Sequence, residues 1–235
     1  MSLDLDKAEK LATMIGSSLD LIKTIDIELF RRIIDLIRGY VPISSPTIQI
    51  HNSFSAKSLL GVIFLSESYN DIRLAEAIVH EFHHNELYML METKQLIQDK
   101  YNENKFYSPW REDARPLFGL LHAIYVFNGV FDFYTKAENQ SKSNKDKAQY
   151  RLRRIETYYR MRIGLIQIPA DSLTTLGQSI ISSITENIYN YELELDLKGK
   201  PIPSYIQEHI KKWCVRHPEL ASEIKSDSLL INTGD

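Results

Sequence analysis

The chain has 235 residues, of which 28 are Lys or Arg and 31 are Asp or Glu, so its formal net charge is −3. This length suits a single domain spanning residues 1–235 with a sizeable core, and the near-neutral charge argues against a nucleic-acid-binding or anionic-membrane surface. The single cysteine, Cys214, excludes an internal disulfide and a metal site built from several cysteines, and it suits a reducing cytoplasm.

The chain also lacks the patterns of secretion and membrane insertion. Its first six residues are acidic and mixed, without a basic segment followed by an apolar run. No stretch approaches about 18 uninterrupted apolar residues. We therefore expect a cytoplasmic protein that has no membrane span and no nucleic-acid partner.

The first third of the chain predicts a helical region followed by a small sheet. Apolar residues recur at helical spacing over 5–39, and Gly39 and Pro42 end that pattern. Two strand candidates follow at 47–51 and 59–65, and the polar connector between them favours a hairpin.

The remainder predicts mostly helices. Asn70 or Asp71 can cap a long helix that runs to about Lys94, and Pro116 suits the first position of another, which runs to about Lys136. Helical patterns resume over three further ranges: 148–163, 171–193 and 203–214. The expected fold class is mainly α with a small β-hairpin or sheet.

One segment of the long helix has the composition of a metal site. His80-Glu81-Phe82-His83-His84 fits H-E-x-x-H, and residues at i and i+4 share a helix face, so His80 and His84 can bind one ion. Glu81 can face a metal-bound water or the substrate. The alternative is a surface helix with chance histidines, although these side chains are costly to bury unless something binds them. We expect His83, on an adjacent face, to be structural.

Two histidines rarely complete a metal site, so a third ligand is needed. The short zincin spacing, H-E-x-x-H-x-x-G-x-x-H, is not present. The candidate on the following helix is His122, which comes 122 − 84 = 38 residues after His84. A neutral core histidine is the alternative interpretation of His122, and Asp132 and Glu92 are weaker ligand candidates.

Two arginines precede His122. Arg115 is seven residues earlier, so two helical turns return it to nearly the same face, with Gly119 leaving room between them. Arg115 or Arg111 could therefore bind a carboxylate whose other end touches the metal. The alternative is a salt bridge at the helix start, to Glu112 or Asp113.

These residues resemble a family of H-E-x-x-H proteins encoded beside ribosomally made, post-translationally modified peptides and named as peptide-modification proteins. The matching segments lie between about residues 53 and 134. They are Ser53-Phe54-Ser55 with Gly61, the run Leu74 to His84, and Ser108-Pro109-Trp110-Arg111 through Arg115-Pro116-Leu117 to His122. Trp213 to Pro218 matches more loosely.

The resemblance implies a zincin-like helical core around the H-E-x-x-H helix and a ribosomally made precursor peptide as the substrate. It also implies that some members are Fe(II)- and 2-oxoglutarate-dependent hydroxylases of peptide side chains. On that reading His80, His84 and His122 hold Fe(II), and Arg111 or Arg115 holds the distal carboxylate of 2-oxoglutarate. The second reading is a zinc peptidase in which Glu81 is the general base. A binding module with a structural metal, or with none, is the third.

Overall fold

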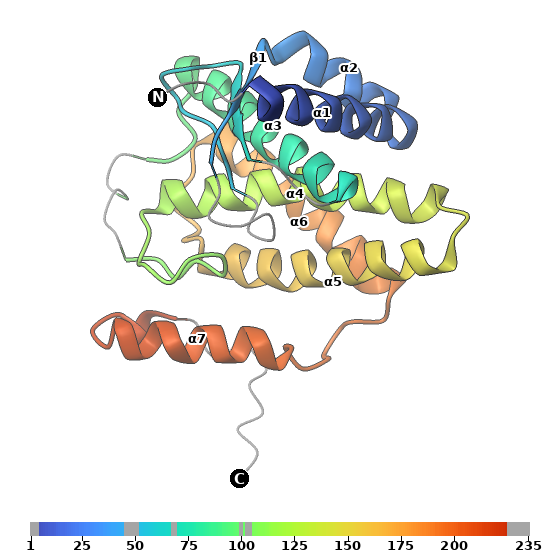
Figure 1. Ribbon diagram of the computed structural model, residues 1–235. Helices are drawn as coiled ribbons and strands as arrows, with labels where there is room; N and C mark the ends of the chain where they lie inside the picture. The colour runs from blue at the N-terminus through green and yellow to red at the C-terminus, as the bar shows by residue number, and fades with distance from the viewer. Residues whose placement is uncertain (1–4, 45–51, 67–69, 99–100, 102–104, 225–235) are drawn as a thin grey trace. The chain divides into compact units, whose positions relative to one another are not determined.

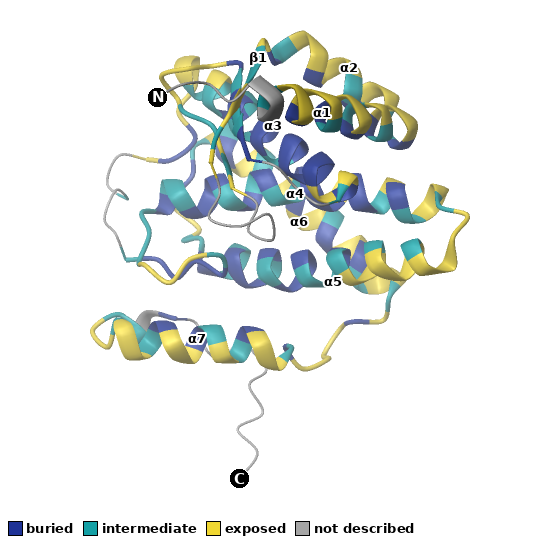
Figure 2. Ribbon diagram, viewed as in Figure 1, coloured by how far each residue is buried: buried dark blue, intermediate teal, exposed yellow. Residues whose placement is uncertain are grey.

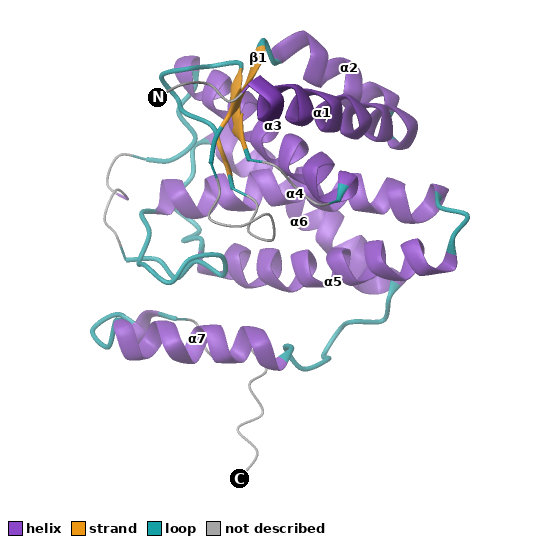
Figure 3. Ribbon diagram, in the orientation of Figure 1, coloured by secondary structure: helices purple, strands orange, loops and turns teal. Residues whose placement is uncertain are grey.

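The computed structural model describes residues 5–44, 52–66, 70–98, 101 and 105–224. It is mainly helical with a small three-stranded sheet (Figures 1 and 3), which confirms the expected class at that level. The helices are α1 (Leu5–Ile25), α2 (Ile27–Leu36), α3 (Asp71–Thr93), α4 (Leu117–Gln140), α5 (Asn144–Gln167), α6 (Thr175–Glu194), α7 (Ser204–Arg216) and the short 3-10 helix η2 (Ala221–Glu223); the strands are β1 (Gly39–Pro42), β2 (Ser53–Phe54) and β3 (Val62–Leu65).

The chain forms two compact units, each made from separate stretches of sequence. The first contains Met1–Thr93 and Gly129–Arg151, and the second contains Lys94–Asn128 and Leu152–Asp235. Helices α4 and α5 therefore contribute residues to both units. The two units are described one at a time below.

The first unit begins with two helices where the sequence predicts one continuous helical region. Asp26 interrupts that region because its backbone is extended, with a φ of −150°. The Asp26 side chain then caps α2 by accepting a hydrogen bond from the Leu29 backbone N–H at 3.1 Å. Helix α1 contacts α3, and the Ser18 hydroxyl donates to the Asp71 carbonyl at 3.2 Å.

The sheet of the first unit has the order β1–β3–β2, with β1 parallel and β2 antiparallel to β3. The predicted hairpin therefore exists, but its first strand is Ser53–Phe54, which the sequence assigns to the connector. The predicted strand 47–51 lies outside the described residues. Gly39–Pro42 forms a strand, although the sequence marks it only as a helix end. Ile63 and Leu65 alternate into the core at 0% exposure.

Strand β3 is shorter than the predicted 59–65 because a turn occupies the residues before it. Gly61 takes a φ of +81°, and an added Cβ would lie 3.0 Å from the Leu36 carbonyl oxygen. Glycine is therefore required where the chain turns into β3. Since β1 and β2 flank this strand, it is the central strand of the sheet.

The second unit packs helices around aromatic side chains. Trp213 of α7 and Tyr158 of α5 are 1% and 0% exposed. The Tyr158 hydroxyl donates to Glu192 of α6 at 2.9 Å, and the Arg154 guanidinium lies 4.2 Å from the centre of the Tyr191 ring. These contacts join α5 and α6 within this unit, and Figure 2 colours the buried residues along its helices dark blue.

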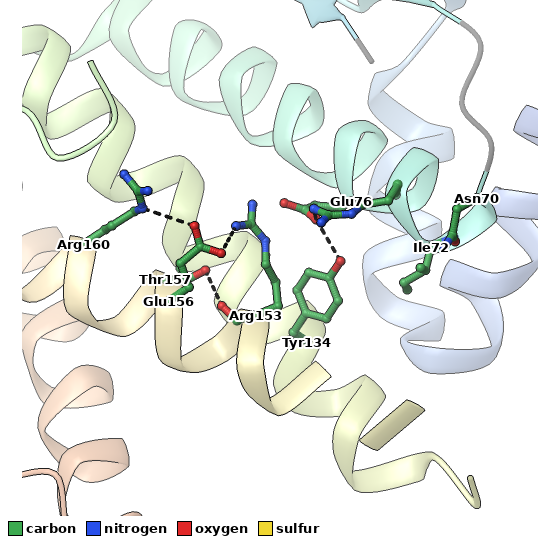
Figure 4. Close-up of polar contacts among 9 residues, drawn as sticks. Asn70, Ile72, Glu76, Tyr134, Arg153, Glu156, Thr157 and Arg160 are labelled. Carbon is green, nitrogen blue, oxygen red and sulfur yellow. Dashed lines mark hydrogen bonds and ion pairs between the residues drawn. The ribbon is translucent and has the colours of Figure 1, made fainter. Parts of the chain in front are cut away.

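Figure 4 shows polar contacts inside each unit. In the first, the Tyr134 hydroxyl donates to Glu76 at 2.8 Å, which pairs the buried Glu76 of α3 with α4. In the second, Glu156 accepts ion pairs from Arg153 at 2.7 Å and Arg160 at 3.4 Å along α5. The hydrogen bond from Tyr134 offsets the free-energy cost of burying the Glu76 carboxyl group. The ion pairs of Glu156 lie on a half-buried helix face, where such pairs contribute little to stability.

Helix α4 is long and apolar enough to cross a membrane by length and composition alone, with a mean hydropathy of 1.3 over its most apolar window. Of that window, 61% is buried within the protein. Core helices of soluble proteins share this composition, so α4 is weak evidence for a membrane span.

Candidate metal centre

Helix α3 carries the H-E-x-x-H segment in its middle, as the sequence predicts. The helix starts one residue after Asn70, whose side-chain oxygen accepts a hydrogen bond from the Ile72 backbone N–H at 2.9 Å (Figure 4). This is the capping expected of Asn70. The helix then continues to Thr93, close to the predicted end.

The structure brings His80 and His84 together on one face of α3. Their Nε2 atoms are 3.1 Å apart, and the two rings meet at 72°. At a metal–nitrogen distance of about 2.0–2.1 Å, two ligands of one ion are about 3.0 Å apart at a right angle and about 3.4 Å apart at the tetrahedral angle. The separation is that of a hydrogen bond between the two rings, and it also suits two imidazoles that share an ion.

Glu81 is 2% exposed, and its two carboxylate oxygens differ. Oε1 accepts a hydrogen bond from the Ser53 hydroxyl at 2.8 Å, whereas Oε2 is buried with no hydrogen-bond partner among the described residues. Burial raises the pKa of Glu81, and hydrogen bonds from Ser53 and Ser55 lower it in part. A buried acceptor oxygen left unsatisfied on the helix of the two histidines is a position where a bound ligand could donate a hydrogen bond.

A hydrogen-bond network holds the sheet against this part of α3. Asn85, which is 0% exposed, accepts from the Gly61 backbone N–H at 2.7 Å and donates to the Ser55 hydroxyl at 3.0 Å. The Asn85 amide also donates to the Glu81 backbone carbonyl at 2.9 Å. Sequence reasoning missed these roles. The alternation Ser53-Phe54-Ser55, which puts both serines on one side of a strand, is the signal that points to them.

His83 is 8% exposed and contacts other residues of the first unit. Its Nδ1 lies 3.0 Å from Glu86 Oε2, and Arg32 forms an ion pair with the same carboxylate. A Cβ added at Gly129 of α4 would lie 2.0 Å from the His83 ring, so the ring fits against bare backbone. These contacts support the structural role expected of His83.

His122, the predicted third ligand, belongs to the second unit and is 5% exposed. Burial, and to a smaller degree the positive charge of Arg115, lowers the pKa of His122 to about 4. The imidazole is therefore neutral at pH 7, which a metal ligand requires and which a core histidine also shows. Both interpretations of His122 remain open.

Arg115 lies along the same face of α4 as His122. A Cβ at Gly119 would be 3.1 Å from Arg115 Nε, so the side chain extends over this glycine as expected. Arg115 Nη1 also forms an ion pair with Asp113 at 3.0 Å, the alternative that the sequence suggests. Arg111 is exposed, and its backbone N–H donates to the Ser108 carbonyl at 3.2 Å.

The weaker ligand candidates are both exposed. Glu92 forms an ion pair with Lys57 at 3.2 Å, and Asp132 lies on α4. Among the residues that the structure describes, no three His, Cys, Asp or Glu side chains are gathered as a complete metal site. The pair formed by His80 and His84 is thus the geometric basis for the candidate centre.

Comparisons with known proteins add no assignment. No protein-family model matches the chain, and no curated protein matches it either.

Proposed function

We propose that the chain is a metal-dependent enzyme whose metal ion is bound by His80 and His84, with His122 as the third ligand. The observation that carries this proposal is the 3.1 Å separation of the two Nε2 atoms, which suits two ligands of one ion. The buried Oε2 of Glu81, which has no hydrogen-bond partner among the described residues, supports an active centre rather than a purely structural one. A structural metal has no use for an acid at that position.

We further propose that the reaction is hydroxylation of a side chain in a ribosomally made precursor peptide, with Fe(II) and 2-oxoglutarate as cofactors. Bound iron and 2-oxoglutarate would supply the oxidation of an unactivated carbon. Arg115 or Arg111 would hold the distal carboxylate of the cosubstrate through a two-pronged hydrogen bond. In this chemistry Glu81 orients a neighbouring ligand and need not transfer a proton.

The second candidate is a zinc-dependent peptidase that cleaves a precursor peptide. Glu81 Oε2 has no hydrogen-bond partner in the part of the chain that the structure describes, and this favours the peptidase, since a general base needs an acceptor oxygen for the proton of the attacking water. The zinc ion would supply Lewis acidity at the same histidines. Arg111 and Arg115 have no evident role in that reaction.

The two candidates differ in what happens to the peptide. The purified protein would be incubated with the precursor peptide, Fe(II) and 2-oxoglutarate in air, and the peptide analysed by mass spectrometry. Hydroxylation adds about 16 Da, the mass of one oxygen atom, as expected for an iron oxygenase. Cleavage that needs zinc and not 2-oxoglutarate supports the peptidase, and an unchanged peptide in both conditions contradicts both candidates.

A further inference from the structure

We propose that Ser53 is a positioning residue for Glu81. Its hydroxyl holds one carboxylate oxygen, so that the other accepts a hydrogen bond from a proton-donating ligand of the metal at His80 and His84. The inference rests on the proposed function, because it needs the metal, but it assigns a role to a strand residue outside the H-E-x-x-H segment.

The two carboxylate oxygens of Glu81 have different hydrogen-bond environments. An ionised carboxylate has room for several donors. The Ser53 hydroxyl donates to Oε1 at 2.8 Å, and the Ser55 hydroxyl lies near the same residue and donates to its backbone carbonyl at 3.3 Å. Oε2 has no partner within the described part of the chain. Leaving a buried charged acceptor unsatisfied is costly, so a ligand that brings a donor recovers free energy that a ligand without one does not.

Ser53 can position the carboxylate because its own strand is fixed. On one side, the Asn52 backbone N–H donates to the Ser66 hydroxyl at 2.8 Å. On the other, the Ser55 hydroxyl accepts from Asn85 of α3 at 3.0 Å and donates to a backbone carbonyl of that helix at 3.3 Å. Because hydrogen bonds fix both Asn52 and Ser55, the Ser53 hydroxyl is held beside α3. Ligand binding therefore does not have to bear the entropy cost of ordering a free loop.

The alternation along this strand explains why a serine occupies the position. Ser53 and Ser55 face α3, whereas Phe54 faces the other way and stacks on Phe64 at 4.3 Å between ring centres. An apolar residue at position 53 would leave the buried Oε1 unsatisfied as well. A hydroxyl satisfies Oε1 without adding a charge that would neutralise Glu81.

The test uses two probes on the protein loaded with Co(II), whose visible spectrum reports on ligands of the metal. Acetohydroxamate binds metal ions and carries a proton donor, whereas azide binds without one. Affinities of both would be measured for the wild type, Ser53→Ala, Ser53→Thr and Glu81→Gln. Thr24→Ala is the matched control, since it removes an exposed hydroxyl of the first unit that donates to the Asp20 carbonyl of its own helix.

We expect Ser53→Ala to weaken acetohydroxamate about tenfold to a hundredfold, the range for a hydrogen bond to a charged group, and to leave azide binding unchanged. Ser53→Thr, which keeps the hydroxyl, should restore the affinity. In the Glu81→Gln background, Ser53→Ala should cause no further loss, because the two residues act through one interaction. Thr24→Ala should bind both probes as the wild type does.

Two results would overturn the proposal in different ways. Equal acetohydroxamate affinity in wild type and Ser53→Ala, with Co(II) bound, rejects the role of Ser53 alone. Equal losses for both probes, or the same loss in Thr24→Ala, show a general effect on the fold and reject it too. Failure of the wild type to bind Co(II), or undiminished binding by His80→Ala, removes the metal site and this inference with it.

Discussion

Glu81 distinguishes the two proposed reactions, because it has a different task in each. In a peptidase the carboxylate removes a proton, so Glu81→Gln should reduce the rate by several orders of magnitude while the metal stays bound. In a hydroxylase the variant should keep substantial activity. The measurement is the rate of peptide cleavage or hydroxylation with metal content determined in the same sample. A hydroxylation lost as completely as in His80→Ala would contradict the role given to Glu81.

The arginines before α4 test the cosubstrate. Arg115 extends over Gly119 toward the face of His122 while also pairing with Asp113. If one arginine binds 2-oxoglutarate, its replacement by lysine keeps the positive charge but loses the two-pronged hydrogen bond of the guanidinium group. The Michaelis constant for 2-oxoglutarate should therefore rise about ten- to a hundredfold. Arg115→Lys and Arg111→Lys would be compared at equal iron content. An unchanged constant in both, or a wild type indifferent to 2-oxoglutarate, would favour the peptidase.

Single residues were the part that sequence could predict best at this site. The i, i+4 spacing predicts the approach of His80 and His84 because a helix fixes it locally. Ser53 could not be found in this way. It reaches Glu81 from 28 residues away, and that contact depends on the pairing of β2 with β3 rather than on any local rule.

The packing of α3 on α4 within the first unit depends on Gly129. A Cβ there would lie 2.0 Å from the His83 ring, and His83 in turn pairs with Glu86. Gly129→Ala should therefore force the ring to shift and destabilise the protein by about 1–3 kcal/mol, the usual cost of overpacking. Chemical denaturation would measure the change in the free energy of unfolding.

Gly16, in the middle of α1, is the matched control. It is exposed, and an added Cβ meets nothing within 4 Å. Gly16→Ala should be neutral or stabilise by up to about 1 kcal/mol, because alanine has the higher helix propensity. Equal stability of Gly129→Ala and Gly16→Ala would show that the close approach of His83 to α4 is not required.

Helices were predicted better than strands. The pattern for α3 gives its start at Asn70 and its end within a residue or so, because capping and periodicity are local signals. The sheet was assigned less well. β1 is a short parallel strand that begins at Gly39 and ends at Pro42, and β2 contains only two residues. Neither strand therefore shows an alternation of apolar and polar residues that can be recognised in the sequence.

At the level of the whole chain, the helical spacing of apolar residues predicts a mainly helical protein but not its division into two units. Each unit combines stretches far apart in sequence, and α4 and α5 contribute to both. Two boundaries between the units fall inside α4 and α5. Because the apolar residues of a long helix keep the same spacing along its whole length, these boundaries are not visible in the sequence. His80 and His84 belong to the first unit, and His122 and the arginines to the second.

The most direct test is the metal content of the purified protein after loading with Fe(II) under anaerobic conditions or with Zn(II), measured by elemental analysis. We predict one tightly bound ion per chain in the wild type, almost none in His80→Ala or His84→Ala, and a strong loss in His122→Ala. The control is His217→Ala, which removes a histidine of the second unit outside the proposed site and should keep the ion. A wild type without stoichiometric metal, or full occupancy in His80→Ala and His84→Ala, would contradict the proposal that this pair forms a metal centre.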